Sequence, residues 1–505
     1  MESEQPSVAV GGGDETSVVA GATLADPVVP ADPRDARIAE LETKLAAALT
    51  RIAELEARLG LNSGNSSLPP SSDRPWNKRK PKRRGPSGRK AGGQRGHKGA
   101  HRELLPPEQV DAVVEHRPTS CSHCGTAFAG DETAVGEPTR QQVTELPPVV
   151  VQVTEHRGVT VRCGECGQTT PGLLPAAVRE SAFGPRLQAA LATLSRHRLS
   201  RREVTEVAED LLGTSISVGS VQESCERVSA ALAEPVAEVE KRVREVTYAH
   251  ADETGWKWAG LRVWMWVVVT AIGTVFRITQ SRRGNIIAGM LGPLFAGTLV
   301  VDRCAAYNRL GRAVRQLCWA HLKRDFQALV DLGGPAQPIG EWALRETHLL
   351  FELWHAFQNK SLSEADFRAS LGLVKGRFKR LLRQGAEQLT AKKGRGLCKN
   401  LLKYWDNLWV FTEVPGVEPT NNRAERALRR AVLWRRGSQG SRSQEGAVFV
   451  QRILTAGATC QQYGRSLLDY LTTVCEAALH GRPVPSLLPA PASTDQDESP
   501  AALAA

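Results

Sequence analysis

The chain has 505 residues, 41% of them hydrophobic, and carries a formal net charge of +11 at pH 7. This length predicts three or four domains with buried cores, and the charge favours a polyanionic partner such as DNA. No apolar run reaches the roughly 20 residues that cross a bilayer, and no secretory signal pattern opens the chain. The 10 cysteines are too sparse for a disulfide scaffold and are typical of a reducing compartment. We therefore expect a cytoplasmic, nucleoid-associated protein.

The first segments in chain order are a tail and a heptad seam. Residues 1–33 are rich in small residues and are expected to be disordered. Over residues 34–61, apolar side chains alternate steps of three and four, which predicts a short coiled coil and hence a homo-oligomer. The seam consists of Ile38, Leu41, Leu45, Ala48, Ile52, Leu55 and Leu59. The alternative is one amphipathic helix that packs on its own domain.

A basic linker is expected at residues 62–105. From Arg74 to Arg102 the sequence contains many Lys and Arg residues and no acid, mixed with Gly and Pro. Such a segment has no core, so we expect it to neutralise phosphates along a nucleic-acid backbone without reading base sequence. The candidate DNA-binding residues here are Lys78, Arg79, Lys80, Lys82, Arg83, Arg84, Arg89 and Lys90. The alternative is a linker that only keeps the protein in solution.

Two Cys-x-x-Cys pairs define a predicted zinc ribbon at residues 106–175. The pairs are Cys121 with Cys124 and Cys163 with Cys166, and a glycine follows each pair. Four thiolates complete a tetrahedral zinc site with no open position, so the predicted zinc is structural. Between the pairs, residues 142–153 and 158–162 have the composition of strands. Two redox pairs, or four ordinary buried cysteines, are the alternatives.

Residues 176–245 have a helical pattern throughout. A helix from Arg201 ends at Gly213, and a second helix begins near Gly219 after a Ser-rich link. This order is typical of a helix-turn-helix that binds DNA. An ordinary helical hairpin has the same pattern, and both interpretations stay open.

A mixed α+β domain is expected from residues 246–335 and 416–445. Three β-rich runs between Tyr248 and Thr279 predict an antiparallel meander with Asp252 on its first strand. A later apolar strand ends at Asp302, and a segment from 315 to 321 is predicted as a strand that passes into a helix at Leu322. Residues 336–415 form a predicted helical insertion, residues 446–482 the C-terminal helices, and residues 483–505 a disordered tail.

Three acidic side chains are the candidate catalytic residues. An Asp on the first strand of a meander, an Asp at the end of a later strand and a Glu on a following helix describe a ribonuclease H-like centre. Asp252, Asp302 and Glu425 would then bind two Mg²⁺ ions roughly 3.5–4 Å apart. The alternative for Glu425 is that it pairs with nearby arginines on an exposed helix.

Several motifs of the chain resemble the DDE transposases of the insertion-sequence 66 family. The segments that match in the catalytic region are His250-Ala-Asp-Glu-Thr-Gly-Trp256, Cys318-Trp-Ala-His321 and Thr420-Asn-Asn-Arg-Ala-Glu-Arg426. Asn65–Asp73, Gly92–His97 and the paired Cys-x-x-Cys also match, in the same order. The resemblance runs from about Ile38 to His480.

The resemblance implies a multidomain α+β protein with a ribonuclease H-like catalytic domain and an assignment for each candidate residue. Asp252, Asp302 and Glu425 become a catalytic triad that binds Mg²⁺ or Mn²⁺. The four cysteines become zinc ligands, and His321 and Arg324 contact DNA or shape the site. Arg429 lies on the same helix face as Glu425 and is a further candidate DNA contact.

The implied activity is cutting and joining of DNA at the ends of an insertion element. Water activated by metal would release a 3′-hydroxyl at the element end, and this hydroxyl would attack target DNA. Small accessory proteins of the same element are implied as partners. A DNA-binding regulator without catalysis, and a nuclease that cuts without joining, are the competing hypotheses.

Overall fold

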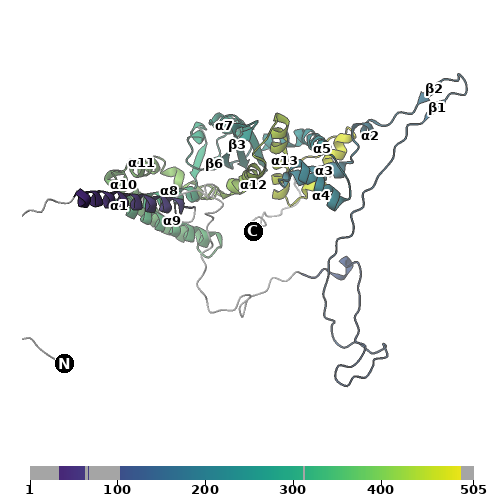
Figure 1. Cartoon of the computed structure of the whole chain (residues 1–505), viewed down its shortest axis with the longest axis horizontal. Coiled ribbons are helices and arrows are strands. Elements are labelled where there is room, and N and C mark those ends of the chain that lie inside the picture. Colours follow the sequence, from purple (N-terminus) through teal and green to yellow (C-terminus); the bar gives the residue numbers. More distant parts are fainter. Residues whose placement is uncertain (1–32, 63–65, 67–102, 311–312, 491–505) are drawn as a thin grey trace, which may run out of the picture. The chain divides into compact units, whose positions relative to one another are not determined.

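The computed structural model describes residues 33–62, 66, 103–310 and 313–490 (Figure 1). The predicted tail up to residue 32 and nearly all of the basic linker lie outside these ranges. The candidate DNA-binding residues from Lys78 to Lys90 therefore also lie outside the described residues. The chain divides after Arg79 into two compact units.

The described part of the first unit is essentially one helix, α1, from Pro33 to Leu59. Its heptad seam is exposed: Ile38, Leu41, Leu45, Ile52, Leu55 and Leu59 each have between 42% and 59% of their surface accessible. The predicted helix is confirmed. An apolar stripe that is exposed along a helix is the feature that a partner helix covers in a coiled coil, and self-association through it remains a prediction.

The region from 103 to 175 contains little regular structure. It holds the short 3₁₀ helix η3 (Pro107–Gln109) and a two-stranded antiparallel sheet of β1 (Thr160–Arg162) and β2 (Thr169–Pro171). The strand predicted at residues 142–153 is wrong, since the structure has no strand there. Its apolar residues, such as Val143 and Val153, are exposed. They therefore do not pack against another element that would stabilise a strand here.

Five helices follow the zinc-ribbon region. They are α2 (Ala176–Glu180), α3 (Pro185–Arg196), α4 (Arg201–Leu212), α5 (Val218–Ala231) and α6 (Ala233–Arg242). Ser200 and Glu203 form a capping box at the start of α4, and Gly213 ends it with a φ of +65°, which glycine adopts without strain. Ser217 caps α5. The two helices predicted around a glycine turn are confirmed.

The central sheet has five strands in the order β5-β4-β3-β6-β7. The strands are β3 (Tyr248–Trp258), β4 (Leu261–Val269), β5 (Thr274–Thr279), β6 (Thr298–Val301) and β7 (Val314–Leu317). The first three form the predicted antiparallel meander, and β6 and β7 run parallel to β3. Together with the helices, this makes a mixed α+β protein.

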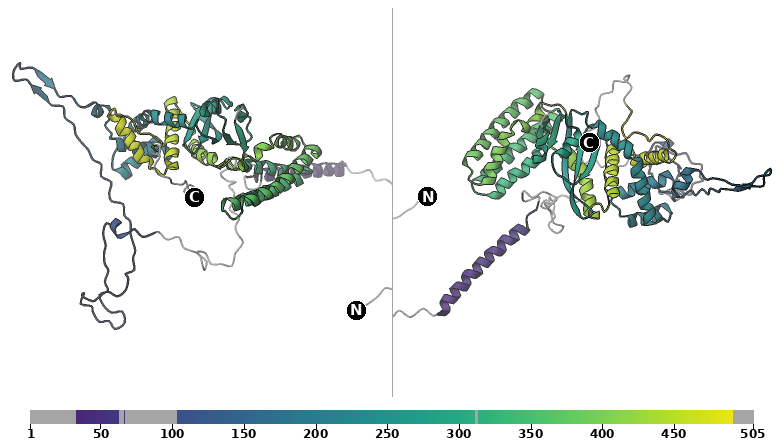
Figure 2. Two further views of the ribbon diagram at one scale, coloured as in Figure 1. Left: turned by 180° about the vertical axis from the view of Figure 1, so that it is seen from behind. Right: turned by 90° about the horizontal axis from the view of Figure 1, so that it is seen from above.

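Further helices lie on the sheet or on the helices beside it (Figure 2) and contribute to the largest core. They are α7 (Asn285–Leu291), the 3₁₀ helix η4 (Ala305–Arg309), α12 (Asn422–Ser438), α13 (Gln444–Gln462) and α14 (Leu467–Leu479). α12 packs on β3 and β4, and α13 packs on β5. Buried residues of α12, such as Ala424 and Leu428, join Trp256 of β3 in one core.

A helical bundle lies between β7 and α12 in the sequence. It consists of α8 (Trp319–Leu332), α9 (Ala336–Gln358), α10 (Glu364–Gln388), α11 (Lys392–Lys403) and the 3₁₀ helices η5 (Asp406–Leu408) and η6 (Val410–Thr412). A second core with an aromatic centre holds it together, in which Trp319 lies 5.4 Å from Phe378 and 5.0 Å from Trp409 between ring centroids.

Two local predictions are wrong. α8 begins at Trp319 rather than Leu322, because the indole of Trp319 is buried in the bundle core and donates a hydrogen bond to the carbonyl oxygen of Leu408. Residues 483–490 are ordered rather than part of a disordered tail, because Leu487 is fully buried and its carbonyl oxygen accepts a hydrogen bond from Arg465. Among the described helices, none is long and apolar enough to cross a membrane.

Candidate active site

The parallel pairing of β3 with β6 brings two candidate carboxylates level with each other. The register pairs Tyr248 with Thr298 and His250 with Val300. Continued two residues further, the same register sets Asp252 opposite Asp302, which directly follows β6. Residues that face each other across parallel strands point to the same side of a sheet. Asp252 on β3 and Asp302 directly after β6 therefore lie at the same end of this strand pair, and the charge of Asp302 acts on Asp252.

The first turn of α12 brings the third carboxylate, Glu425, to this face. The helix begins after Asn421, whose fully buried side chain donates a hydrogen bond of 2.7 Å from Nδ2 to the carbonyl oxygen of Ala251. The Oδ1 atom of Asn421 lies 3.3 Å from Nδ1 of His250. At its other end, α12 is tied to β3 by Arg435, which donates to Oγ1 of Thr254 at 3.1 Å. Glu425 is thus on a helix that β3 holds at both ends.

The electrostatics of the three carboxylates show that they share one environment. Burial raises the pKa of Asp252 well above its usual range, and the negative charges of Glu253, Asp302 and Glu425 raise it further. Burial likewise raises the pKa of Glu425, an effect that Asp302 increases and Arg324 opposes. When carboxylates lie close together in a partly buried site, their repulsion favours either protonation of one of them or binding of a cation. The three predicted residues therefore lie near enough to act on one another's charge. Within the described residues, their carboxylate oxygens do not all lie within 4.8 Å of one another, and a shared metal centre remains a prediction.

Glu253, next to Asp252, belongs to a separate network on the opposite face of β3. Its side chain is only 1% exposed and forms an ion pair of 2.6 Å with Arg282. The hydroxyl of Tyr307 donates a hydrogen bond to the other carboxylate oxygen. Alternation along a strand explains the separation of two adjacent acids. Sequence reasoning placed them on opposite faces but did not find the partners of Glu253.

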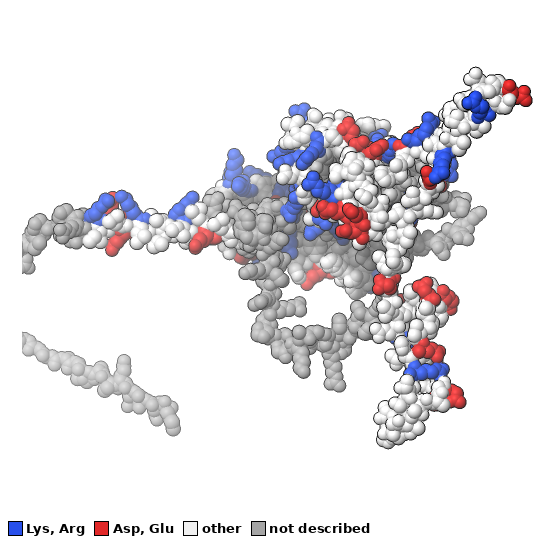
Figure 3. Space-filling model, turned by 45° about the vertical axis from the view of Figure 1, so that its right-hand side comes forward, with Lys and Arg blue, Asp and Glu red and all other residues white. Residues whose placement is uncertain are grey.

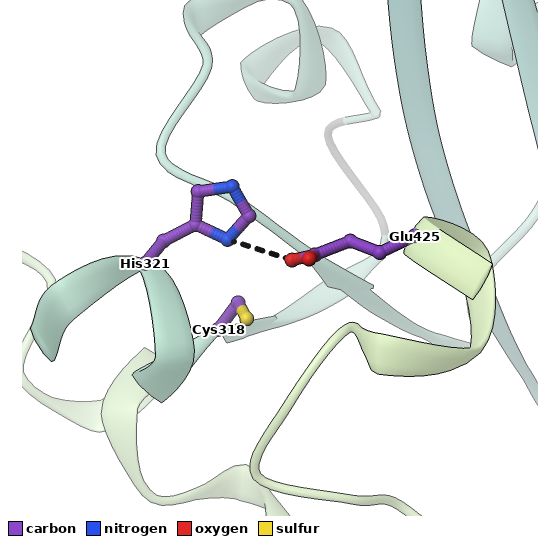
Figure 4. Close-up of side chains that lie close together, drawn as sticks. All are labelled: Cys318, His321 and Glu425. Carbon is purple, nitrogen blue, oxygen red and sulfur yellow. Dashed lines mark ion pairs between the residues drawn. The ribbon is translucent and has the colours of Figure 1, made fainter. Parts of the chain in front are cut away.

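His321 and Cys318 lie beside Glu425 (Figure 4). Nδ1 of His321 is 3.3 Å from Oε1 of Glu425, and these atoms together with Sγ of Cys318 lie within 4.8 Å of one another. Burial, and then the charge of Arg324, lowers the pKa of His321 to about 4, so the imidazole is neutral at pH 7. Cys318 is a site residue that sequence reasoning missed, although it stands in the same four-residue motif.

The predicted DNA contacts near the triad differ in their surroundings. His321 faces Glu425 rather than solvent, Arg324 is half-buried and acts on the charges of the site, and Arg429 is exposed on α12. On the face drawn in Figure 3, Lys and Arg side chains gather in patches with acidic clusters between them. Of the three, Arg429 is the most exposed, and its contact with DNA remains a prediction.

The four cysteines of the predicted zinc ribbon form two separate turns. The amide N–H of Gly125 donates to the carbonyl oxygen of Cys121, and that of Gly167 donates to the carbonyl oxygen of Cys163. Both glycines have positive φ angles, +77° and +72°, which glycine adopts without strain. Each turn therefore has the backbone that a zinc knuckle needs. Within the described residues, the four sulfur atoms do not form one cluster, and the zinc centre remains a prediction.

Residues 180–449 match the model described as the transposase IS66 family. Residues 118–167 match the zinc-finger binding domain of the same transposases, and residues 26–103 match a family of unknown function. Two uncharacterized proteins of Sinorhizobium fredii, y4hP and y4qI, are similar to the chain. y4hP is 25% identical over 402 residues, an alignment that covers 70% of this chain and 70% of y4hP. y4qI is 24% identical over 412 residues, which cover 74% of this chain and 74% of y4qI.

Proposed function

The chain belongs to the IS66 transposase family, and from this membership we propose that it is a DDE transposase. It binds the ends of a DNA insertion element, cuts the phosphodiester at the element end and joins the resulting 3′-hydroxyl to target DNA. The observation that supports this proposal is that the charges of Asp302 and Glu425 act on Asp252 and that of Asp302 acts on Glu425, although the three acids come from separate elements of the chain.

The sheet topology supports a ribonuclease H-like catalytic domain. An antiparallel meander followed by two parallel strands places the first acid on β3 and the second directly after β6. The third acid comes from α12, after a helical bundle of about ninety residues in the chain. This is the order strand, strand, helix that the predicted centre requires, and the bundle is an insertion that leaves the sheet intact.

The donor set fits Mg²⁺ or Mn²⁺. Asp252, Asp302 and Glu425 supply only carboxylate oxygens, the ligands that a hard cation prefers. Oε1 of Glu425 is buried and accepts no hydrogen bond, and burial, followed by repulsion from neighbouring carboxylates, raises the pKa values of Asp252 and Glu425. Bound cations would neutralise this charge and polarise the scissile phosphate.

The role of the protein is to position two successive displacements at phosphorus. In the first, the oxygen of a water molecule bonds to phosphorus and the 3′-oxygen leaves as a hydroxyl, with a 5′-phosphate on the other strand end. In the second, this hydroxyl attacks a target phosphodiester and displaces the 3′-oxygen there, so that no bond to the protein forms. Asn421 and Arg435 fix α12 on β3, which keeps Glu425 beside the aspartates throughout.

The remaining segments are assigned to DNA binding and assembly. The basic linker neutralises phosphates, and the zinc ribbon and the helices α3 to α5 hold the terminal repeats. α1 pairs with another copy through its exposed seam, so that two element ends meet in one complex. Small accessory proteins of the element take part. The exposed face of α5 carries Glu223 and Glu226, which disfavours deep insertion of this helix into a DNA groove.

The test is strand transfer with the purified full-length protein. DNA that contains the inverted repeats flanking its coding sequence is incubated with Mg²⁺ and a plasmid target, and the products are sequenced. Joined ends with a short target duplication support the transposase. Cut ends without joining identify a nuclease, and DNA binding without any cutting identifies a regulator without catalysis. Either of the last two results rejects the proposal.

A further inference from the structure

Cys318, His321 and Glu425 come from two helices that are fixed to each other. Cys318 precedes α8, and His321 lies in its first turn. The start of α12 is joined to them by two backbone donors: the N–H of Trp319 bonds to the carbonyl oxygen of Pro419, and the N–H of Asn421 bonds to Sγ of Cys318 at 3.1 Å. The three side chains therefore face one another from a rigid frame (Figure 4).

Two atoms of this cluster are buried without a hydrogen bond. They are Nδ1 of His321 and Oε1 of Glu425, which lie 3.3 Å apart. Buried polar atoms nearly always have a partner, yet these two atoms face each other from α8 and α12 without forming a hydrogen bond. A cation bound to both atoms would satisfy them together.

The donor types select the kind of cation. A thiolate and an imidazole are ligands for zinc and for similar transition metals, whereas Mg²⁺ prefers oxygen. One Cys, one His and one carboxylate leave the fourth position of a tetrahedral zinc site open. The sulfur of Cys318 already accepts a hydrogen bond from Asn421, a contact that stabilises the thiolate formed when the thiol loses its proton to solvent on metal binding.

We propose that Cys318, His321 and Glu425 form a second transition-metal site, distinct from the four-cysteine ribbon, that binds Zn²⁺. Glu425 then belongs to two donor sets, one with the aspartates and one with Cys318 and His321. If the proposed transposase function holds, zinc at this site withdraws Glu425 from the magnesium centre and inhibits the protein. The existence of the site does not depend on that function.

The experiment counts metal ions in the intact full-length protein, without DNA. Purified protein is loaded with Zn²⁺, freed of excess metal and measured by elemental analysis, and it is loaded with Co²⁺ for optical spectra. Cys318→Ser and His321→Gln are each expected to bind one ion fewer per chain than the parent protein. Cys163→Ser loses the ion of the ribbon instead, and combining it with Cys318→Ser removes both. Cys318→Ser also loses part of the thiolate-to-cobalt absorption.

The matched control is Cys398→Ser, since Cys398 is a buried cysteine of α11 outside the cluster. It is expected to leave the metal count and the cobalt spectrum unchanged. Circular dichroism and thermal unfolding confirm that each variant is folded. An unchanged metal count in folded Cys318→Ser and His321→Gln would overturn the proposal. Because the readout involves no strand transfer, this failure is separate from a failure of the proposed function.

Discussion

The side-chain amide of Asn421 donates a hydrogen bond of 2.7 Å to the carbonyl oxygen of Ala251, the residue before Asp252. This bond links the start of α12 to the strand that carries the first carboxylate. It sets the position of Glu425, four residues further along the helix, relative to Asp252. The geometry of the candidate active site therefore depends on a residue that is not itself one of the three acids.

Asn421→Ala is expected to reduce both stability and strand transfer. The substitution removes a fully buried side chain with contacts to Ala251 and His250, and leaving buried polar groups unpaired costs roughly 1–3 kcal/mol. Thermal unfolding and the rate of strand transfer measure the two effects. Asn422→Ala is the matched control, because Asn422 is exposed. Equal behaviour of the two variants would contradict the anchoring role.

Asp252→Asn is expected to abolish strand transfer while the protein stays folded. Loss of a metal-binding carboxylate removes several kcal/mol of transition-state stabilisation, or roughly 10³-fold in rate. The measurement is the initial rate of joining with Mg²⁺, for variant and wild type at equal concentration. Asp210→Asn, an exposed substitution on α4, serves as the control. Wild-type activity in Asp252→Asn would reject the assignment of the triad.

Stability without divalent cations is expected to fall as pH rises above the ordinary pKa values of the carboxyl groups of Asp252 and Glu425. Burial and neighbouring charges raise the folded-state pKa values of Asp252 and Glu425 above the ordinary values of 3.8 and 4.5. The folded state therefore binds more protons than the unfolded state above those ordinary values, and stability decreases with pH until the folded-state pKa is passed.

The pH effect is measured as the melting temperature of wild type and of Asp252→Asn in metal-free buffer. The variant cannot ionise at this position, so its advantage over wild type is expected to grow with pH. Addition of Mg²⁺ is expected to stabilise the wild type selectively at the upper end of the range. If the melting temperature of Asp252→Asn exceeded that of wild type by less at higher pH, the site would not contain carboxylates that repel one another.

Glu253→Gln is expected mainly to reduce stability. It differs in this from Asp252→Asn, which is expected to lose strand transfer while the protein stays folded. The carboxylate of Glu253 is buried and pairs with Arg282 and with the hydroxyl of Tyr307. Weakening these contacts costs roughly 1–3 kcal/mol. Chemical denaturation measures the loss, and Tyr307→Phe should produce part of it. If Glu253→Gln abolished joining without destabilising the protein, Glu253 would belong to the active site instead.

Leu45→Asp is expected to break the self-association of the chain through α1. Leu45 is 59% exposed on the helix, and a charge at the seam of a coiled coil is strongly unfavourable when a partner helix covers it. Light scattering after size-exclusion chromatography gives the molar mass. Ala47→Asp, on an exposed part of the helix outside the seam, should leave the mass unchanged. The same mass for Leu45→Asp and wild type would contradict the coiled coil.

Local patterns were enough to predict much of the fold. The heptad seam predicted α1, the glycine turn predicted α4 and α5, and β-rich runs with short turns between them predicted the meander, because each depends on residues close together in the chain. Predictions failed where distant packing decided the outcome. Trp319 starts α8 early because its indole is buried in a bundle formed by later helices, and Leu487 is ordered by a contact with Arg465.

The sequence alone determined which residue types the site contains: three acids in motifs that match one family, and two cysteine pairs with knuckle turns. Only the tertiary structure decided which of these groups meet. The pairing of β3 with β6 brings Asp252 and Asp302 to the same end of the two strands, and the contact between the starts of α12 and α8 places Cys318 and His321 against Glu425. Proximity between residues far apart in the chain depends on strand pairing and helix packing, which no local spacing encodes.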